Sequence, residues 1–192
     1  LSGSGKSTLL RTVNALAPVV RGDVGLRTAH GMQSVSAARP DALRRIRLND
    51  VAMVFQQFGL LPWRSVRENV GLGLELAGMG RAERRARVDE QLRLVGLADW
   101  ADRKVGDLSG GMQQRVGLAR AFATQAPILL MDEPFSALDA LTRDELSLEL
   151  LNIWTQRPKT VLFITHSIPE ALSETSFVCG SVNVASSRAG IN

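Results

Sequence analysis

The chain has 192 residues, of which 45% are hydrophobic and 22% charged, and its net charge is +4. This balance is typical of a globular protein and excludes a disordered or collagen-like chain. The single cysteine, Cys179, excludes a disulfide framework and a cysteine-ligated zinc site. The apolar runs are too short to cross a membrane. We therefore expect about one domain with a hydrophobic core of its own.

The basic residues are mostly arginine, since Lys6, Lys104 and Lys159 are the only lysines. A basic surface could bind nucleic acid or anionic lipid. In the predicted helix Arg81–Leu94, however, acidic residues are interspersed with the arginines. This mixture is typical of a solvated helix face. We therefore expect no nucleic-acid partner.

The first third of the chain begins with a glycine-rich loop at residues 1–4, followed by a predicted helix over Ser7–Leu16. Val19–Asp50 is polar and shows no regular pattern. Val51–Phe55 is a short apolar run that favours a strand.

The middle of the chain, Ser65–Thr124, has a helical pattern. Within it, Val88, Leu92 and Val95 recur at the spacing of one apolar helix face. The pattern breaks before a new helix that we expect to begin near Met112.

Strands reappear in the last third. Ile128–Asp132 and Thr160–Thr165 are apolar strand candidates, and Leu141–Trp154 between them is a predicted helix. After Ala171 the sequence is small and polar and its pattern weakens. Strands that alternate with helices predict an α/β fold with a mostly parallel sheet.

The segment from Gly3 to Thr8 matches the end of the phosphate-loop motif G-x-x-x-x-G-K-[ST]. Its glycines let backbone N–H groups surround phosphate oxygens, and the helix that follows presents its positive end to the anion. We expect Lys6 to bind the β- and γ-phosphates and the Ser7 hydroxyl to bind Mg²⁺. The simpler alternative is a glycine-rich turn before a helix. The predicted nucleotide-binding residues are Gly3, Ser4, Gly5, Lys6, Ser7 and Thr8.

The segment Ile128–Glu133 is an apolar run that ends in two acids, Asp132 and Glu133. Ligands collect at the carboxyl ends of buried parallel strands. Asp132 is therefore a candidate Mg²⁺ ligand, and Glu133 a candidate general base for an attacking water. Alone, the pair could equally be a solvated strand end.

The stretch Asp107–Arg115, which reads Asp-Leu-Ser-Gly-Gly-Met-Gln-Gln-Arg, resembles the signature motif of ATP-binding-cassette (ABC) ATPases. Other family motifs occur in the expected order along the chain. They are the Walker A loop at residues 1–8, the Q-loop glutamine Gln56, Walker B at residues 128–133, the D-loop with Asp139, and the switch histidine His166.

This resemblance implies a phosphate-loop NTPase fold with ATP and Mg²⁺ as ligands. Residues 1–55 and 127–192 would form its core, and residues 56–126 an inserted helical subdomain. Two subunits would pair head to tail, so that the partner's Ser109, Gly110 and Gly111 contact the γ-phosphate. Four further residues would complete the site: Gln56 at Mg²⁺ or the attacking water, Glu133 as base, Asp139 at the opposite phosphate loop and His166 at the γ-phosphate.

Among ABC proteins, the chain is most similar to the ATP-binding subunits of bacterial importers. The interval from Ser7 to Ser109 is too short for the long insertions of DNA-linked ABC proteins, so a non-transport role is the minor alternative. We expect a homodimer bound to transmembrane permease subunits on the cytoplasmic face of the bacterial plasma membrane, served indirectly by a solute-binding protein. Leu60, Leu61 and Trp63 could receive the permease or belong to the subdomain core.

The cargo is indicated by resemblance alone. Leu74–Gly78 and Gln114–Ala123 are similar to subunits of quaternary-amine importers for choline, glycine betaine and proline betaine. Ala140–Arg143 and Ile153–Trp154 are more similar to nitrate, sulfonate and taurine importers. We predict a quaternary amine. The start at Leu1 inside a motif, and the atypical tail, lead us to expect a fragment lacking both ends.

Overall fold

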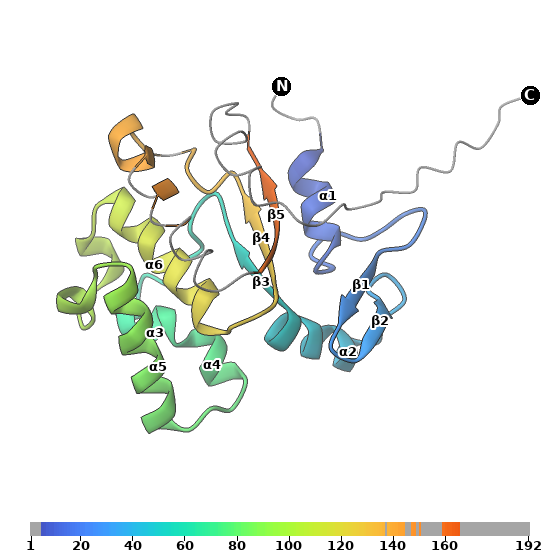
Figure 1. The fold of residues 1–192 in the computed structure, drawn as a ribbon, viewed down its shortest axis with the longest axis horizontal. Helices are drawn as coiled ribbons and strands as arrows, with labels where there is room; N and C mark the ends of the chain where they lie inside the picture. The colour runs from blue at the N-terminus through green and yellow to red at the C-terminus, as the bar shows by residue number, and fades with distance from the viewer. Residues whose placement is uncertain (1–4, 137, 145–146, 149, 151–158, 166–192) are drawn as a thin grey trace, which may run out of the picture.

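A computed structural model describes residues 5–136, 138–144, 147–148, 150 and 159–165. At its centre lies a parallel sheet of three strands in the order β3 (Val51–Val54), β4 (Ile128–Asp132) and β5 (Thr160–Ile164) (Figure 1). Val51 and Thr160 both pair with Ile128, so the register is set across the whole sheet. The three predicted strands are confirmed, although β3 and β5 each end one residue earlier than expected.

Both faces of β4 are covered, which explains its unbroken apolar sequence. Leu129 and Met131 pack into a cluster with Leu118 and Phe122 of α6 (Gly110–Ala123). Leu130 points to the other face, into a second cluster that includes Leu10. Figure 1 shows the resulting three layers, with α1 (Lys6–Thr12) on one side of the sheet and α6 on the other. The predicted α/β class is confirmed.

Helix α1 ends at Thr12, four residues before the predicted end at Leu16. Ala15 adopts a left-handed conformation with φ of 55°. The side-chain oxygen of Asn14 then accepts a hydrogen bond from the Leu16 N–H at 3.2 Å. Asparagine can satisfy the backbone in this way outside a helix, and this capacity stops the helix early.

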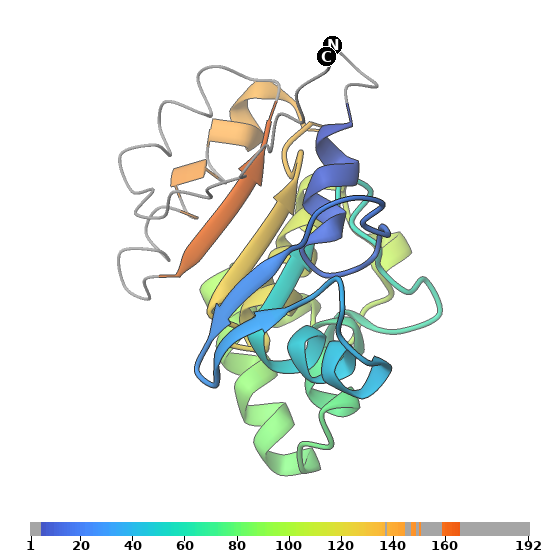
Figure 2. The same cartoon turned by 90° about the vertical axis from the view of Figure 1, so that its right-hand side faces the viewer.

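The prediction that Val19–Asp50 is irregular was wrong. This segment forms an antiparallel hairpin of β1 (Gly25–Thr28) and β2 (Gly31–Ser34), then α2 (Pro40–Arg45) and a π-helical turn, η1 (Ile46–Asp50). The hairpin lies on the same face of the sheet as α1 (Figure 2). Each strand has four residues and only Leu26 and Thr28 are buried in β1, so the alternation was too short to be recognised in the sequence.

Between β3 and β4 every regular element is a helix. These are α3 (Val66–Val70), α4 (Leu72–Leu76), α5 (Arg81–Leu94), the 3₁₀ turns η2 (Ala98–Trp100) and η3 (Val105–Asp107), and α6. They share a separate apolar cluster in which Val88, Leu92 and Val95 are buried, as the spacing predicted. This cluster supports the helical subdomain at residues 56–126, whose boundaries stay a prediction.

The arginines of α5 carry ion pairs along a solvated face. Arg87 lies 3.4 Å from Glu83 and Arg85 lies 3.9 Å from Asp89, each one helical turn apart. Exposed pairs at this spacing contribute only a few tenths of a kcal/mol each. Among the helices that the structure describes, none has both the length and the hydropathy of a membrane-spanning segment.

We expect Leu130→Ala to lower the free energy of unfolding by about 2–5 kcal/mol, because the side chain is fully buried and a cavity would remain. Urea denaturation followed by circular dichroism measures this change. Leu76→Ala, at a position 54% exposed, is the control and should cost less than about 0.5 kcal/mol. Equal midpoints for the two variants would contradict the central position of β4.

Candidate functional site

The N-terminus of α1 lies at the carboxyl end of the parallel sheet. Gly5 precedes this helix in a left-handed conformation with φ of 80°. A Cβ atom built there would meet nothing within 4 Å, so the backbone conformation and not crowding favours glycine. The Gly5 carbonyl accepts from the Leu9 N–H at 2.9 Å and closes the first turn. This turn places Lys6, Ser7 and Thr8 where β4 ends.

Asp132 ends β4 and is fully buried. The Ser7 hydroxyl donates to its Oδ1 atom at 2.6 Å, and Arg11 Nη2 donates to its Oδ2 atom at 3.0 Å. The predicted phosphate loop and the predicted Walker B strand are therefore in direct contact through two residues 125 positions apart. Arg11 was not among the site residues predicted from the sequence. The available signal was its spacing of four residues from Ser7, which places both side chains on one face of α1.

Glu133 and Gln56 meet beside this contact. Gln56 follows the end of β3, and its Nε2 atom donates to Glu133 Oε2 at 3.1 Å. Glu133 adopts a left-handed conformation with φ of 46°, and its N–H donates to the Ile164 carbonyl of β5 at 2.9 Å. Backbone strain of this kind persists where the surroundings hold it, often at functional sites. The structure thus brings the predicted base and the predicted Q-loop glutamine together.

The oxygen atoms at this edge suit Mg²⁺. Ser7 Oγ and Asp132 Oδ1 lie 2.6 Å apart, and both are hard oxygen ligands for a metal ion. Mg²⁺ in phosphate-binding sites is usually held by one or two such protein groups together with phosphate oxygens and water. The residues present therefore fit the predicted ion.

The signature residues lie at the start of α6. Ser109 is exposed and caps the helix, since its Oγ atom accepts from the Met112 N–H at 3.3 Å. A Cβ atom at Gly111 would come within 2.7 Å of the Thr142 Cγ2 atom. A larger residue at position 111 could fit only if Thr142 moved.

Thr142 also connects the signature to Asp139. The Asp139 carboxylate accepts from the Thr142 N–H at 3.0 Å and from its hydroxyl at 2.7 Å. The hydrogen bond from the Thr142 N–H has the largest effect and that from its hydroxyl the next, and together they hold the pKa of Asp139 below its usual value. The structure therefore groups Ser109, Gly111 and Asp139 as a second set of predicted site residues.

These two sets of residues lie apart. Figure 1 shows α1 on one side of the sheet and the first turn of α6 on the other. Gly3, Ser4 and His166 lie outside the described residues, as do Cys179, the tail after Ala171 and half of the predicted helix Leu141–Trp154. The described residues of that stretch, 141–144, 147–148 and 150, are helical.

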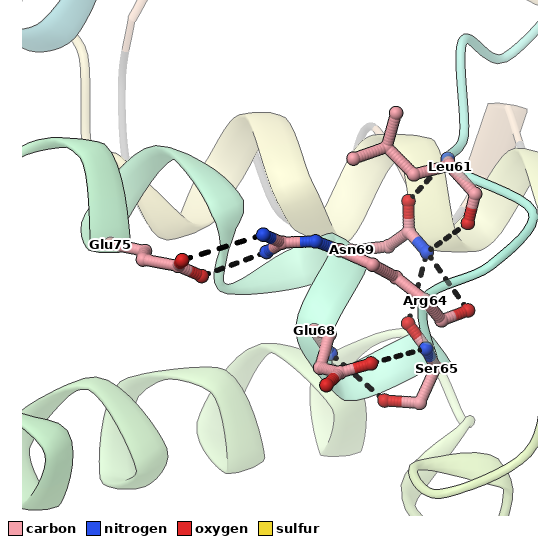
Figure 3. Close-up of polar contacts among 6 residues, drawn as sticks. All are labelled: Leu61, Arg64, Ser65, Glu68, Asn69 and Glu75. Atoms are coloured by element: carbon pink, nitrogen blue, oxygen red, sulfur yellow. Dashed lines mark hydrogen bonds and ion pairs between the residues drawn. The ribbon is translucent and has the colours of Figure 1, made fainter.

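The segment between Gln56 and α3 is irregular but firmly held. Asn69 of α3 is fully buried, and its amide bonds the Leu61 N–H and the carbonyls of Leu61, Arg64 and Ser65 (Figure 3). Leu60 packs against the helical cluster, whereas Trp63 is 69% exposed. Leu60 thus fits a core role, and Trp63 is the apolar side chain presented to solvent.

Polar contacts fix the start of α3 in the same view (Figure 3). The Ser65 hydroxyl accepts from the Glu68 N–H, and the Glu68 carboxylate accepts from the Ser65 N–H at 2.7 Å. The Ser65 N–H holds the pKa of Glu68 below its usual value. Arg64 pairs with Glu75 at 2.8 Å. Trp63 is therefore presented from a well-ordered backbone.

Comparison with known proteins gives three kinds of match. A family model described as "ABC transporter" matches residues 1–136. The taurine import ATP-binding protein of Rhizobium johnstonii is 48% identical over 189 residues, 98% of this chain and 66% of the relative. The glycine betaine/carnitine transport ATP-binding protein of Listeria monocytogenes is 48% identical over 172 residues, 90% of this chain and 42% of the relative. The chain thus spans less than two thirds of either relative.

A solved structure agrees with this assignment. A dimeric ATP-binding cassette in a post-hydrolysis state, bound to ADP and phosphate, superposes with a TM-score of 0.79 at 37% identity. The match covers 90% of this chain and 75% of that one. Relatives named for taurine and for glycine betaine are equally similar, so the quaternary-amine class is not singled out.

We expect Arg11→Met to lower the free energy of unfolding by about 1–2 kcal/mol, because the buried Asp132 carboxylate would lose a charged donor. The partial exposure of Arg11 keeps the value at the lower end. In an Asp132→Asn background the same change should cost less than about 0.5 kcal/mol. Urea denaturation of the four proteins tests the pair, and additive losses would refute the coupling.

Proposed function

The chain belongs to the ABC transporter family, and we propose that it is the ATP-hydrolysing subunit of a bacterial importer. One observation carries this proposal. The Ser7 hydroxyl donates to Asp132 and the Gln56 amide donates to Glu133, which supports the predicted roles of these residues in the phosphate loop, Walker B and the Q-loop. These four residues come from three separate parts of the sequence and meet at one edge of the sheet, where parallel α/β folds bind ligands.

In this proposal the phosphates bind at the start of α1. The backbone of Gly3–Thr8 surrounds them, and Lys6 neutralises the β- and γ-phosphates. Ser7 and Asp132 would hold Mg²⁺, and Gln56 would contact the ion or the attacking water. When bound, Mg²⁺ offsets phosphate charge and orients the phosphate chain. Arg11 keeps the Asp132 carboxylate fixed from its other oxygen.

Glu133 acts as the general base that takes a proton from the attacking water. The hydrogen bond from the Glu133 N–H to the Ile164 carbonyl fixes the backbone of Glu133. The Gln56 amide donates to the Glu133 Oε2 atom and so holds the carboxylate. In this proposal, a movement of the segment Gly59–Trp63 would shift Gln56 and thereby the Glu133 carboxylate. His166 is proposed to hydrogen-bond the γ-phosphate, as its place in the motif order implies.

A second copy of the chain completes each site. Helix α6, whose start carries Ser109, Gly110 and Gly111, lies on the other side of the sheet from its own α1 (Figure 1), and Thr142 relates Asp139 to that start. A head-to-tail pair would bring them to the partner's phosphate loop, where the exposed first turn of α6 can bind anionic oxygens. The solved cassette that resembles this chain is itself dimeric and bound to ADP and phosphate.

The proposed assembly includes permease subunits at the cytoplasmic face of the plasma membrane, with Trp63 in the docking surface. A solute-binding protein would supply the cargo. We propose a quaternary amine, and a sulfonate such as taurine is the alternative, because relatives named for both are 48% identical. Glycine betaine and taurine are both small zwitterions. The absence of a nucleic-acid partner stays a prediction.

We expect Glu133→Gln to lower kcat at least about 100-fold, because the general base is lost, and to trap an ATP-bound dimer. Size-exclusion chromatography of the full-length variant with and without ATP measures the dimer. The matched control is Glu133→Gln combined with Lys6→Ala, which should stay monomeric because nucleotide binding is lost. An elution volume that ATP does not change in the single variant would refute the proposed sandwich.

Cargo can be assigned by uptake in the source bacterium. Deletion of the gene should abolish uptake of labelled glycine betaine, and the wild-type gene but not its Lys6→Ala variant should restore it. Loss of taurine uptake with intact betaine uptake would instead assign the alternative cargo. Uptake of both solutes at wild-type rates would contradict an import role for either.

A further inference from the structure

The connection that follows Gln56 contains a strained turn. The Phe58 N–H donates to the Phe55 carbonyl at 3.1 Å, so Gln56 and Gln57 form the corner of this turn. Phe58 and Gly59 both adopt left-handed conformations, each with φ of 57°. Glycine tolerates this conformation, but phenylalanine has a Cβ atom that disfavours it. The Gly59 N–H donates to the Gln57 carbonyl at 2.5 Å across Phe58, and contacts from outside the turn add to this local hydrogen bond.

The guanidinium of Arg120, on α6, makes those contacts. Its Nη2 atom donates to the Phe58 carbonyl and its Nη1 atom donates to the Gly59 carbonyl, each at 2.7 Å. Burial lowers the pKa of this guanidinium, in keeping with its position between the turn and the helix. Gly117, one turn earlier on α6, packs against this turn, since a Cβ atom at that position would make an ordinary van der Waals contact of 3.9 Å with the Phe58 carbonyl.

We propose that Arg120 is a positioning residue that fixes Gln56 against Glu133 by holding the carbonyls of Phe58 and Gly59. The planar guanidinium presents two donors in a fixed fork, which a lysine ammonium cannot reproduce. If the fork is lost, Phe58 can leave its left-handed conformation and the corner of the turn moves. The Gln56 amide then loses its place 3.1 Å from the Glu133 carboxylate.

This arrangement also connects two motifs that the sequence separates. Arg120 lies on the helix whose first turn carries Ser109–Gly111. The backbone after Gln56 is thereby tied to the signature helix, and the two are expected to move together.

The chain provides a matched control. Arg47 donates from Nε to the Asn14 carbonyl at 2.8 Å and from Nη2 to the Ala15 carbonyl at 2.9 Å. Ala15 is left-handed like Phe58, with φ of 55°. Arg47→Lys therefore removes the same kind of fork from the same kind of backbone, at a turn that does not contain Gln56.

The test compares Arg120→Lys and Arg47→Lys in full-length protein, alone and in a Gln56→Ala background; it rests on the proposed ATPase activity. We expect Arg120→Lys to lower kcat about tenfold or more, with little change in the KM for ATP. In the Gln56→Ala background it should change kcat less than about twofold, because the residue acts through Gln56. An equal loss of kcat in both backgrounds, or an equal loss from Arg47→Lys, would overturn the proposal.

Hydrogen exchange gives a readout that does not depend on activity. Arg120→Lys should speed exchange of the Phe58 amide, while Arg47→Lys leaves it unchanged. Unchanged exchange in Arg120→Lys would overturn the proposal even if no variant hydrolyses ATP. Absence of hydrolysis in the wild-type protein, with the expected exchange pattern, would reject the proposed function and leave the positioning role of Arg120 intact.

Discussion

The buried carboxylate of Asp132 is the constraint on which the rest of the site depends. A carboxylate at the end of a fully buried strand needs strong hydrogen-bond donors, because an unpaired charge there is costly. Ser7 and Arg11 provide them from one face of α1. Satisfying Asp132 therefore docks α1 on the sheet and, in the same contact, brings the residues of the proposed phosphate and magnesium site together.

A second constraint comes from backbone that the chain must hold in unfavourable conformations. Ala15, Phe58 and Glu133 are non-glycine residues with positive φ. The guanidinium of Arg47 donates to the Ala15 carbonyl, and that of Arg120 donates to the Phe58 carbonyl. The Glu133 N–H donates to the Ile164 carbonyl of β5. Phe58 lies two residues after Gln56, and Glu133 is itself part of the Gln56–Glu133 contact. Strain of this kind is kept only where surrounding contacts over-determine it.

Much of this arrangement could be predicted from the sequence, and the failures have physical reasons. The apolar runs of β3, β4 and β5 and the periodic face of α5 were recognised because burial imposes strong patterns on them. The β1–β2 hairpin was missed because its short strands bury few residues. The contacts of Arg11 and Arg120 were missed for another reason. Arginine is usually a surface residue. Only the tertiary fold shows which guanidinium meets a buried carboxylate or the carbonyl of a residue with a strained backbone.

The three-layer architecture determines which of the predicted site residues can meet within one copy of the chain. Alternate residues of β4 face α1 and α6, so packing the sheet places these helices on opposite faces. The phosphate loop at the start of α1 and the signature at the start of α6 cannot then meet within one copy. In the proposed assembly, the same packing that makes the core stable leaves each half-site incomplete, and a second copy with reversed orientation would supply what is missing. Under the proposed function, ATP acts as the common ligand that joins the two half-sites, and its hydrolysis removes the contact that holds them together.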